Sequence, residues 1–417
     1  MSVENNSSNV SNLCYRDYAF LLTYVTVISV ISGAASSQMS SERTEILIVN
    51  AGRRSAVEGD LYDVNTDSFT SRSIFDKNLN NVTFISKNLK RDTDYKFLSS
   101  NSYEGKLKDL DISGHFGVSI LSGLVTLSGA GKYVTSEASN SKSVKGSLLY
   151  RYIAEKDTIK LSSIDFLNHV SKNVFILPDS THFVSGITRG CNAIIEFETF
   201  LDDEKNFTSV MGNMEAAVDT LKAAFSVNAA VQVSHNNNKD KFNEIKNFKV
   251  FVDFHMDVIP QTIEELLEFT KTIPEKCKTQ VNEISYELYP LSKLKILLEQ
   301  ILKQTTNSMF RLYNKVEEDV NLEIVRAFDK AQKTNKKITD VELKIMSYSD
   351  YVSQTIITKI NDLRHAWTVH YTKFAVALKD TLAIVREGKN SSSELTRIIN
   401  DFTSHDMSPA KVLQKLR

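Results

Sequence analysis

The spacing of apolar residues changes near Pro260, and this change constrains the fold more than any other feature of the sequence. Before Pro260, apolar and polar residues alternate in short runs, as at residues 147–153, 191–198 and 248–256. A period of two is typical of strands with one buried face. After Pro260, apolar residues recur every three or four positions, which is typical of amphipathic helices. The sequence therefore predicts a β-rich part followed by an all-helical part.

Two long apolar series make up most of the helical part. The first runs from Leu294 to Ile324 and the second from Val341 to Val385, and no proline interrupts either series. We expect each series to form one helix of about 40 residues, with Gly388 placed where a helix end favours a left-handed residue. Long one-sided helices of this kind pack in an antiparallel bundle. Shorter helices are expected at residues 262–271, 393–402 and 409–417.

The composition is that of a soluble globular protein with two or three folded units. The chain has 417 residues, with 50 Lys and Arg against 51 Asp and Glu, and its net charge is −1. A protein that binds nucleic acid by neutralising phosphates needs a surplus of basic residues. We therefore expect no nucleic-acid partner. Three cysteines are too few for a scaffold built on disulfides.

An uncharged stretch at residues 19–35 indicates a targeting segment. Its apolar run and the small residues at 33–35 are typical of a secretory signal with its cleavage site. We expect residues 1–41 to form a signal peptide or N-terminal hydrophobic segment, and the protein to be secreted. A membrane anchor and a buried element of the first domain are the alternatives, so membrane-anchored and cytoplasmic locations stay open. Cleavage would remove Cys14 and leave Cys191 and Cys277 as the cysteines that could pair.

Motifs for catalysis or metal binding are absent from the sequence. It contains no His-Glu-x-x-His, Cys-x-x-Cys, Gly-x-Ser-x-Gly or Asp-rich calcium loop. Residues 128–133 lack the glycine spacing and the metal-binding hydroxyl of a phosphate loop. His365 and His370 are five residues apart, which predicts different helix faces, and we interpret His182 and Cys191 as structural. We therefore expect no catalytic residue, no metal site, no cofactor and no enzyme activity.

Residues 207–235 fit a helix at first and a strand afterwards. Apolar residues step by three and four from Met211 to Phe225, and the chain then alternates strictly. The alternating run is close to the roughly 9–11 residues of a tilted membrane-spanning strand. One side of that strand would carry Phe225, Val227, Ala229, Val231 and Val233, and the other Ser226, Asn228, Gln232 and Ser234.

Residues 111–133 are ambiguous in the same way. Phe116, Ile120 and Leu124 fit one face of a helix, while Phe116, Val118 and Ile120 fit one face of a strand. Under one interpretation, both segments are stored as helices and released into lipid as amphipathic hairpins. Hairpins from several subunits would then have to close into one barrel, because sheet edges cannot stay unpaired in hydrocarbon. Under the other, both are ordinary amphipathic helices that cover a sheet.

Four sets of residues follow one another along the chain, at 52–53, 59–63 and 75–76, at 117–125 and 131–133, at 181–190, and at 258–262. Each set is weak alone, and the order makes them specific. Together they resemble the opening motif, the first convertible segment, the signature strand and the junction into the helical domain of the stonustoxin-like branch of the perforin (MACPF)/cholesterol-dependent cytolysin superfamily.

The resemblance implies an α+β fold with a bent four-stranded antiparallel sheet flanked by helical clusters near residues 106–141 and 203–241. An all-α helical bundle domain would follow. The expected domains are residues 42–259, of MACPF/CDC-like stonustoxin type, and residues 260–417, the helical bundle. Gly186 and Gly190 in the signature strand would act as the sheet hinge.

These observations favour a pore-forming or membrane-perturbing protein that oligomerises on membranes and inserts amphipathic β-hairpins. The expected partners are a lipid membrane and a homo- or hetero-oligomer. The membrane-inserting residues would be Phe116, Val118 and Ile120 in one hairpin, and Phe225, Val227, Ala229, Val231 and Val233 in the other. The alternative is a non-lytic secreted interaction protein, in which the perforin-like scaffold and the helical bundle bind a protein partner.

Overall fold

The computed structural model describes residues 45–76, 82–176, 179–201, 206–223, 225, 242–243, 245–303, 309 and 311–416. The expected N-terminal segment at residues 1–41 lies outside these ranges, as do Val227, Ala229, Val231 and Val233. Residues from Ile46 onward form one compact unit.

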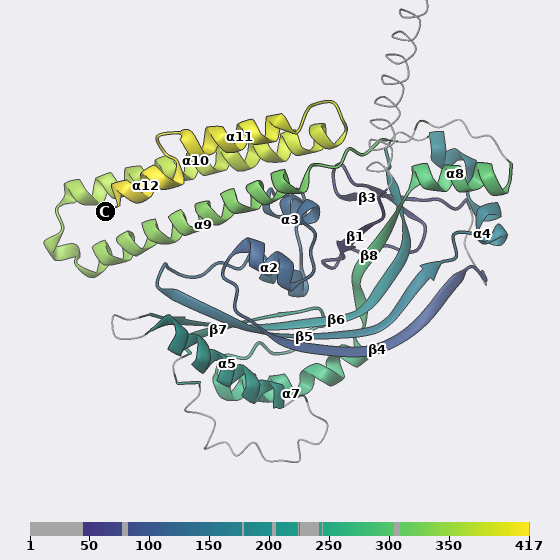
Figure 1. Ribbon diagram of the computed structural model, residues 1–417. Coiled ribbons are helices and arrows are strands. Elements are labelled where there is room, and N and C mark those ends of the chain that lie inside the picture. Colours follow the sequence, from purple (N-terminus) through teal and green to yellow (C-terminus); the bar gives the residue numbers. More distant parts are fainter. Residues whose placement is uncertain are drawn as a thin grey trace, which may run out of the picture. The chain divides into compact units, whose positions relative to one another are not determined.

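One antiparallel sheet of eight strands runs through the described part of this unit (Figure 1). Its long strands are β4 (Ile85–Leu98), β5 (Ser143–Ile159) and β6 (His182–Phe200), and β7 (Asn247–Val252) pairs with the second half of β6. The order β4-β5-β6-β7 and the strong curvature visible in Figure 1 confirm the predicted bent four-stranded sheet. The strands predicted at 147–153 and 191–198 lie within β5 and β6, whereas the one at 248–256 ends earlier, at Val252.

The sheet continues beyond Pro260, so the chain does not become all-helical there. Strand β8 (Asn282–Pro290) pairs with β1 (Leu47–Asn50) on one side and with the first half of β6 on the other. Its alternation of buried Ile284, Tyr286 and Leu288 has the period of two expected of a strand. Two short strands, β2 (Asp60–Asp63) and β3 (Ser68–Ser73), complete the sheet.

Successive side chains of β5 and β6 enter different cores because strand residues point alternately to the two faces of a sheet. Leu149 and Ile194 belong to one core, and their neighbours Leu148 and Ile195 to another. The first core includes α2 (Tyr103–Asp109), α3 (Gly114–Leu121), the 3-10 helix η1 (Gly129–Tyr133) and the C-terminal helices. The second core includes α5 (Phe207–Ala223) and α7 (Ile263–Thr279).

Helix α7 covers the sheet and is fixed to it covalently. A disulfide joins Cys277 of α7 to Cys191 of β6, the two cysteines that sequence analysis left to pair. The helix runs longer than the predicted 262–271 and packs on β5 and β6 rather than in the helical bundle. A third core at the other end of the sheet holds α4 (Ile164–His169), the 3-10 helix η2 (Lys172–Ile176) and α8 (Leu291–Ile301).

The C-terminal helices form an all-α region after β8 and α8. It comprises α9 (Glu318–Ser347), the 3-10 helix η3 (Ser349–Tyr351), α10 (Gln354–Arg386), α11 (Ser393–Ser404) and α12 (Pro409–Lys415). Helices α11 and α12 lie where they were predicted, and Gly388 is left-handed at the end of α10 with a φ of 73°. None of the helices in the described part has both the length and the apolar character needed to cross a bilayer.

The two predicted helices of about 40 residues are both interrupted. The first series is divided between α8 and α9, and two described residues between these helices donate backbone hydrogen bonds to other elements. Met309 N–H donates to the carbonyl of Phe175 (2.5 Å), and Asn314 N–H to that of Arg386 (2.7 Å). The second series is divided at residues 348–353, where the chain leaves α9 and returns as α10 (Figure 1).

Candidate functional site

Both segments that fit a helix or a strand lie between strands that are paired with each other. The first helical segment (residues 99–142) connects β4 to β5, and Leu98 of β4 pairs with Ser147 of β5. The second helical segment (residues 201–246, described in part) connects β6 to β7, and Glu198 of β6 pairs with Asn247 of β7. Each segment is therefore an insertion at the end of an existing antiparallel hairpin.

The predicted membrane-inserting residues of the first helical segment come together in α3. Helix α3 begins after Ser113, whose side chain accepts a hydrogen bond from the N–H of Phe116. Phe116, Val118 and Ile120 are all buried, although their spacing spreads them around the helix. They are buried together because α3 packs against α9 as well as against the sheet core.

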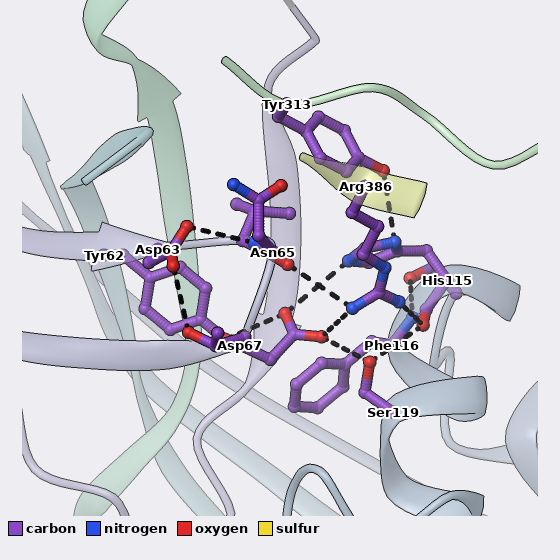
Figure 2. Close-up of polar contacts among 12 residues, drawn as sticks. Tyr62, Asp63, Asn65, Asp67, His115, Phe116, Ser119, Tyr313 and Arg386 are labelled. Carbon is purple, nitrogen blue, oxygen red and sulfur yellow. Dashed lines mark hydrogen bonds and ion pairs between the residues drawn. The ribbon is translucent and has the colours of Figure 1, made fainter. Parts of the chain in front are cut away.

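A buried polar cluster joins α3 to the C-terminal helices (Figure 2). The Asp67 cluster consists of Asp67 from the β2–β3 turn, His115 and Ser119 from α3, and Arg386 from the end of α10. One Arg386 Nη donates to Asp67 Oδ2 (2.8 Å), and the other to the carbonyl of His115 (2.9 Å). Ser119 Oγ also donates to Asp67 Oδ2. Neither charged side chain is exposed, at 0% for both Arg386 and Asp67.

The electrostatics of the Asp67 cluster favour the ionised form of Asp67 and disfavour the protonated form of His115. Burial opposes the charge on Asp67, but the interactions with His115 and Arg386 and the hydrogen bond from Ser119 outweigh it, so the pKa of Asp67 lies well below its usual value. Burial, followed by the charge of Arg386, lowers the pKa of His115. Tyr313 holds the imidazole in place through a 3.1 Å contact between its hydroxyl and His115 Nδ1.

Helix α9 contacts the first helical segment at both of its ends. Asp329 accepts a hydrogen bond from the N–H of Tyr103 (2.6 Å), at the start of α2. Asp340 accepts one from the N–H of Ser141 (3.0 Å), just before β5. Both carboxylates accept from backbone N–H groups, and that of Tyr103 lies in the first turn of α2, where donors have no partner within the helix. The C-terminal helices thus hold the start, the middle and the end of this segment.

A second buried polar group fixes α2 to the sheet. Lys106 Nζ donates to the carbonyl of Ser136 (2.5 Å) and to Glu196 Oε2 on β6 (3.3 Å). Lys145 on β5 donates to the other oxygen of Glu196 (2.6 Å). Burial, with the nearby charge of Lys145 adding to it, lowers the pKa of Lys106 to about 8 even though Glu196 acts in the opposite direction.

The second helical segment is held mainly by apolar contacts. The inner face of α5, which includes Val210, Met214 and Leu221, is buried against the sheet. Phe225 lies over the same face, with its ring centroid 4.8 Å from that of Tyr150 and 5.9 Å from that of Tyr95. Phe225 is the one predicted membrane-inserting residue of this segment that lies among the described residues.

The two glycines predicted as the sheet hinge both lie in β6, where neighbouring strands approach closely. A Cβ at Gly190 would lie 2.0 Å from the carbonyl oxygen of Tyr152 on β5, so no side chain fits there. A Cβ at Gly186 would lie 3.0 Å from the carbonyl oxygen of Asp157. The pairing of β5 with β6 also shifts register opposite Gly190, at a bulge between Ile153 and Glu155.

Sequence analysis did not identify Asp67, Arg386 or Asp329. Asp67 and Arg386 are far apart in the chain, and neither lies in a recognisable motif. A weak signal exists for Arg386, which directly follows the apolar series of α10, where a charged residue at a buried position is unusual. In the described ranges, no group of three or more His, Cys, Asp or Glu side chains could hold a metal ion, and Cys191 is bonded to Cys277.

Comparison with known proteins gives the family. A family model described as "SNTX, MACPF/CDC-like domain" matches residues 46–273. The chain belongs to this family. The match covers strands β1 to β7, both helical segments and the first part of α7, and it confirms the resemblance to the stonustoxin-like branch.

Two relatives and one solved structure match a larger share of the chain than the family model does. Neoverrucotoxin subunit alpha of Synanceia verrucosa is 24% identical over 336 residues, which are 76% of this chain and 43% of the relative. Stonustoxin subunit alpha of Synanceia horrida is 23% identical over 341 residues, 79% of this chain and 45% of the relative. A stonustoxin structure superposes with a TM-score of 0.63 at 16% identity, over 89% of this chain and 47% of that one. The chain therefore spans less than half the length of these relatives, and the structural match shows a shared fold.

Proposed function

We propose that this chain is a pore-forming or membrane-perturbing protein that oligomerises on membranes and inserts a β-hairpin from each helical segment. One observation carries the proposal, namely the position of each segment between two paired antiparallel strands. If a segment extends, β4 and β5, or β6 and β7, simply become longer. Each arm would have about 20 residues, more than the roughly 9–11 that a tilted spanning strand needs.

The lipid-facing side chains of the proposed hairpins are those of the sequence pattern. They are Phe116, Val118 and Ile120 in the first hairpin, and Phe225, Val227, Ala229, Val231 and Val233 in the second. Gly186 and Gly190 are the proposed hinge, which lets β6 bend as the sheet opens. Secretion also belongs to the proposal, since the relatives are named as toxin subunits.

A cross-link between α9 and the first helical segment tests the proposal. Ser141→Cys with Asp340→Cys places two thiols where a hydrogen bond now joins α9 to the segment, and Cys14→Ser removes the unpaired native cysteine. We expect the oxidised protein to release no dye from liposomes and the reduced protein to release it normally. Equal release by both forms would contradict insertion of this segment.

A matched pair of thiols controls for oxidation and for loss of the native disulfide. Glu342→Cys with Arg364→Cys replaces an ion pair between α9 and α10, away from both segments. We expect this variant to release dye equally when oxidised and when reduced. A difference between its two forms would show that the effect comes from redox treatment and not from holding the segment.

A pair of adjacent substitutions tests which face meets lipid. A lysine on the lipid face near mid-bilayer costs about 2–4 kcal/mol, so Val231→Lys should abolish or strongly reduce release. Gln232→Lys, on the opposite face of the same strand, should leave release nearly unchanged. Equal effects of the two substitutions would contradict the assignment of faces.

The second candidate function is a non-lytic interaction protein that uses the same scaffold. The observation that favours it is the number of contacts that hold the first helical segment in place, among them the buried Arg386–Asp67 pair and the two carboxylates of α9. Its test is the wild-type protein on liposomes that differ in charge and sterol content. No release on any of them would favour this function.

A further inference from the structure

An apolar loop with acidic surroundings protrudes next to α7. Val258 and Ile259 are 73% and 61% exposed. The acidic surface consists of these two residues and of four acidic ones, Asp257, Glu264, Glu265 and Glu268. The four acidic residues line the adjoining cleft together with Lys276. Lys276 pairs with Asp257 at 2.9 Å. Glu265 instead accepts a hydrogen bond from the backbone N–H of Gln261 (2.7 Å), a partner that does not neutralise its charge.

A groove of the opposite character lies between α10 and α11. Its apolar walls include Val369, Phe374 and Phe402, and Val369 is 40% exposed. The basic groove is defined by these walls and by the nitrogen-bearing side chains around them. They are His365, His370, Lys373, Arg397 and His405, with Asp401 as the acidic residue among the lining side chains.

The charge of the basic groove rests mainly on Lys373. Arg397 pairs with Glu394 and Asp401 on its own helix. Lys373 is exposed, and no ion pair is formed by its side chain within the described ranges. His370 lies against His405, with ring centroids 4.4 Å apart. His365 and His370 both line this groove, although their spacing predicts different helix faces. An apolar groove that is exposed to water and has the cation of Lys373 at its border fits an apolar partner with a carboxylate such as that of Glu265 at its border.

The acidic surface and the basic groove cannot meet within one chain. Helix α7 belongs to the core on one face of the sheet, and α10 and α11 belong to the core on the other face (Figure 1). The sheet separates the two surfaces. A contact between them must therefore join two molecules.

We propose that the acidic surface of one copy docks into the basic groove of a second copy. Val258 and Ile259 lie against the apolar walls, and Glu265 faces Lys373. The contact uses two different surfaces, so it is heterologous, and each added copy presents a new groove or a new acidic surface. Such contacts close into a ring or continue as a filament. This inference does not rest on membrane insertion and holds for the protein in solution.

Sedimentation velocity of the full chain tests the proposal by charge exchange. We expect the wild type to associate between about 1 and 100 μM, and less so at about 1 M salt, where the screening length is only about 3 Å. Glu265→Lys and Lys373→Glu should each weaken self-association at least about tenfold. An equimolar mixture of the two variants should associate again, because every contact in the mixture can then join opposite charges.

Two control variants place the same charge changes outside the proposed contact. Glu275→Lys on α7 and Lys379→Glu on α10 are exposed and do not line either surface. Both should associate like the wild type, and far-UV circular dichroism should show that all four variants are folded. A wild type that stays monomeric over the whole range would overturn the proposal. A mixture of Glu265→Lys and Lys373→Glu that stays as weak as its components would also overturn it.

Discussion

Replacing Arg386 tests whether the Asp67 cluster fixes the C-terminal helices to the rest of the protein. In Arg386→Met, the side chain remains long and apolar, but Asp67 loses its cationic partner while staying fully buried. Hydrogen bonds from Ser119 and Tyr62 remain. Removing one member of a buried ion pair costs about 3–5 kcal/mol, because an uncompensated charge is left in the core. We expect the free energy of unfolding to fall by that amount.

The assay is urea unfolding followed by far-UV circular dichroism and by fluorescence. Trp367, the one tryptophan of the sequence, is buried in α10 and reports on the C-terminal helices. Arg364→Met is the matched control on the same helix, since its pair with Glu342 is 28% and 29% exposed. It should cost less than about 1 kcal/mol.

A double-mutant cycle separates the ion pair from the loss of packing. Asp67→Asn together with Arg386→Met leaves no uncompensated charge in the cluster. The double variant should therefore be more stable than the sum of the single effects, by about 1–3 kcal/mol. Single effects that simply add, or an Arg386→Met as mild as Arg364→Met, would refute the reasoning.

Three further predictions concern the sheet, the disulfide and pH. Gly190→Ala should lower the free energy of unfolding, measured in urea, by at least about 1–3 kcal/mol, because the added Cβ would overlap a carbonyl oxygen of β5. Gly212→Ala is the control on α5, where the added Cβ meets open space, and it should raise the free energy of unfolding by up to about 1 kcal/mol. Replacing Cys191 and Cys277 by Ala opens a link across 86 residues and should cost about 4–5 kcal/mol on the chain-entropy model, again measured in urea. The pKa of His115 is lower in the folded protein than in the unfolded chain, so the stability that neutral His115 contributes is complete above about pH 6.5 and declines as the pH falls below that value. The urea concentration at the unfolding midpoint should therefore decrease when the pH is lowered from about 7.5 to about 5.5, and it should decrease less in His115→Gln.

The strands of the sheet were predictable where apolar residues alternate along a single segment of the chain. The alternating residues 191–198 lie within β6, and the two faces of this strand pack on different cores. The same signal exists at residues 282–290, where the buried Ile284, Tyr286 and Leu288 are separated by half-buried residues. Sequence analysis assigned this stretch to the helical part, although its period is that of a strand.

The break between α8 and α9 was not predictable from periodicity. Apolar residues continue at helical spacing through residues 294–324, so periodicity gives no reason for a stop, and the one local signal is a run of weak helix formers at residues 305–308. The chain leaves the helix because Lys303 is left-handed, with a φ of 53°, and because backbone donors at Met309 and Asn314 bond to distant carbonyls. Tyr313 and Val316 then pack in the first core, together with α2, α3 and the C-terminal helices. Tertiary contacts therefore decide the conformation of this stretch.

The Asp67 cluster was beyond prediction for a related reason. Its four members come from three segments that are distant in the sequence, namely the β2–β3 turn, α3 and the end of α10. The sequence around an Asp or an Arg does not show which distant residue its side chain contacts. The position of the first helical segment was predictable from its own residues, whereas the contacts that hold it depend on the folded C-terminal helices.

The two helical segments are held by different forces, and this difference bears on how either could be released. Apolar packing of α5 on the sheet weakens gradually as the helix moves away, because it has little directional preference. The Asp67 cluster behaves differently, since a shift of α10 by one turn would separate Arg386 from Asp67 and leave the buried carboxylate without its ion pair. Well-packed apolar residues would stabilise the same contact at least as well as this ion pair does. We infer that the buried ion pair selects one register of α10 against α3, and on the proposed function this would make release of the first helical segment an all-or-none step.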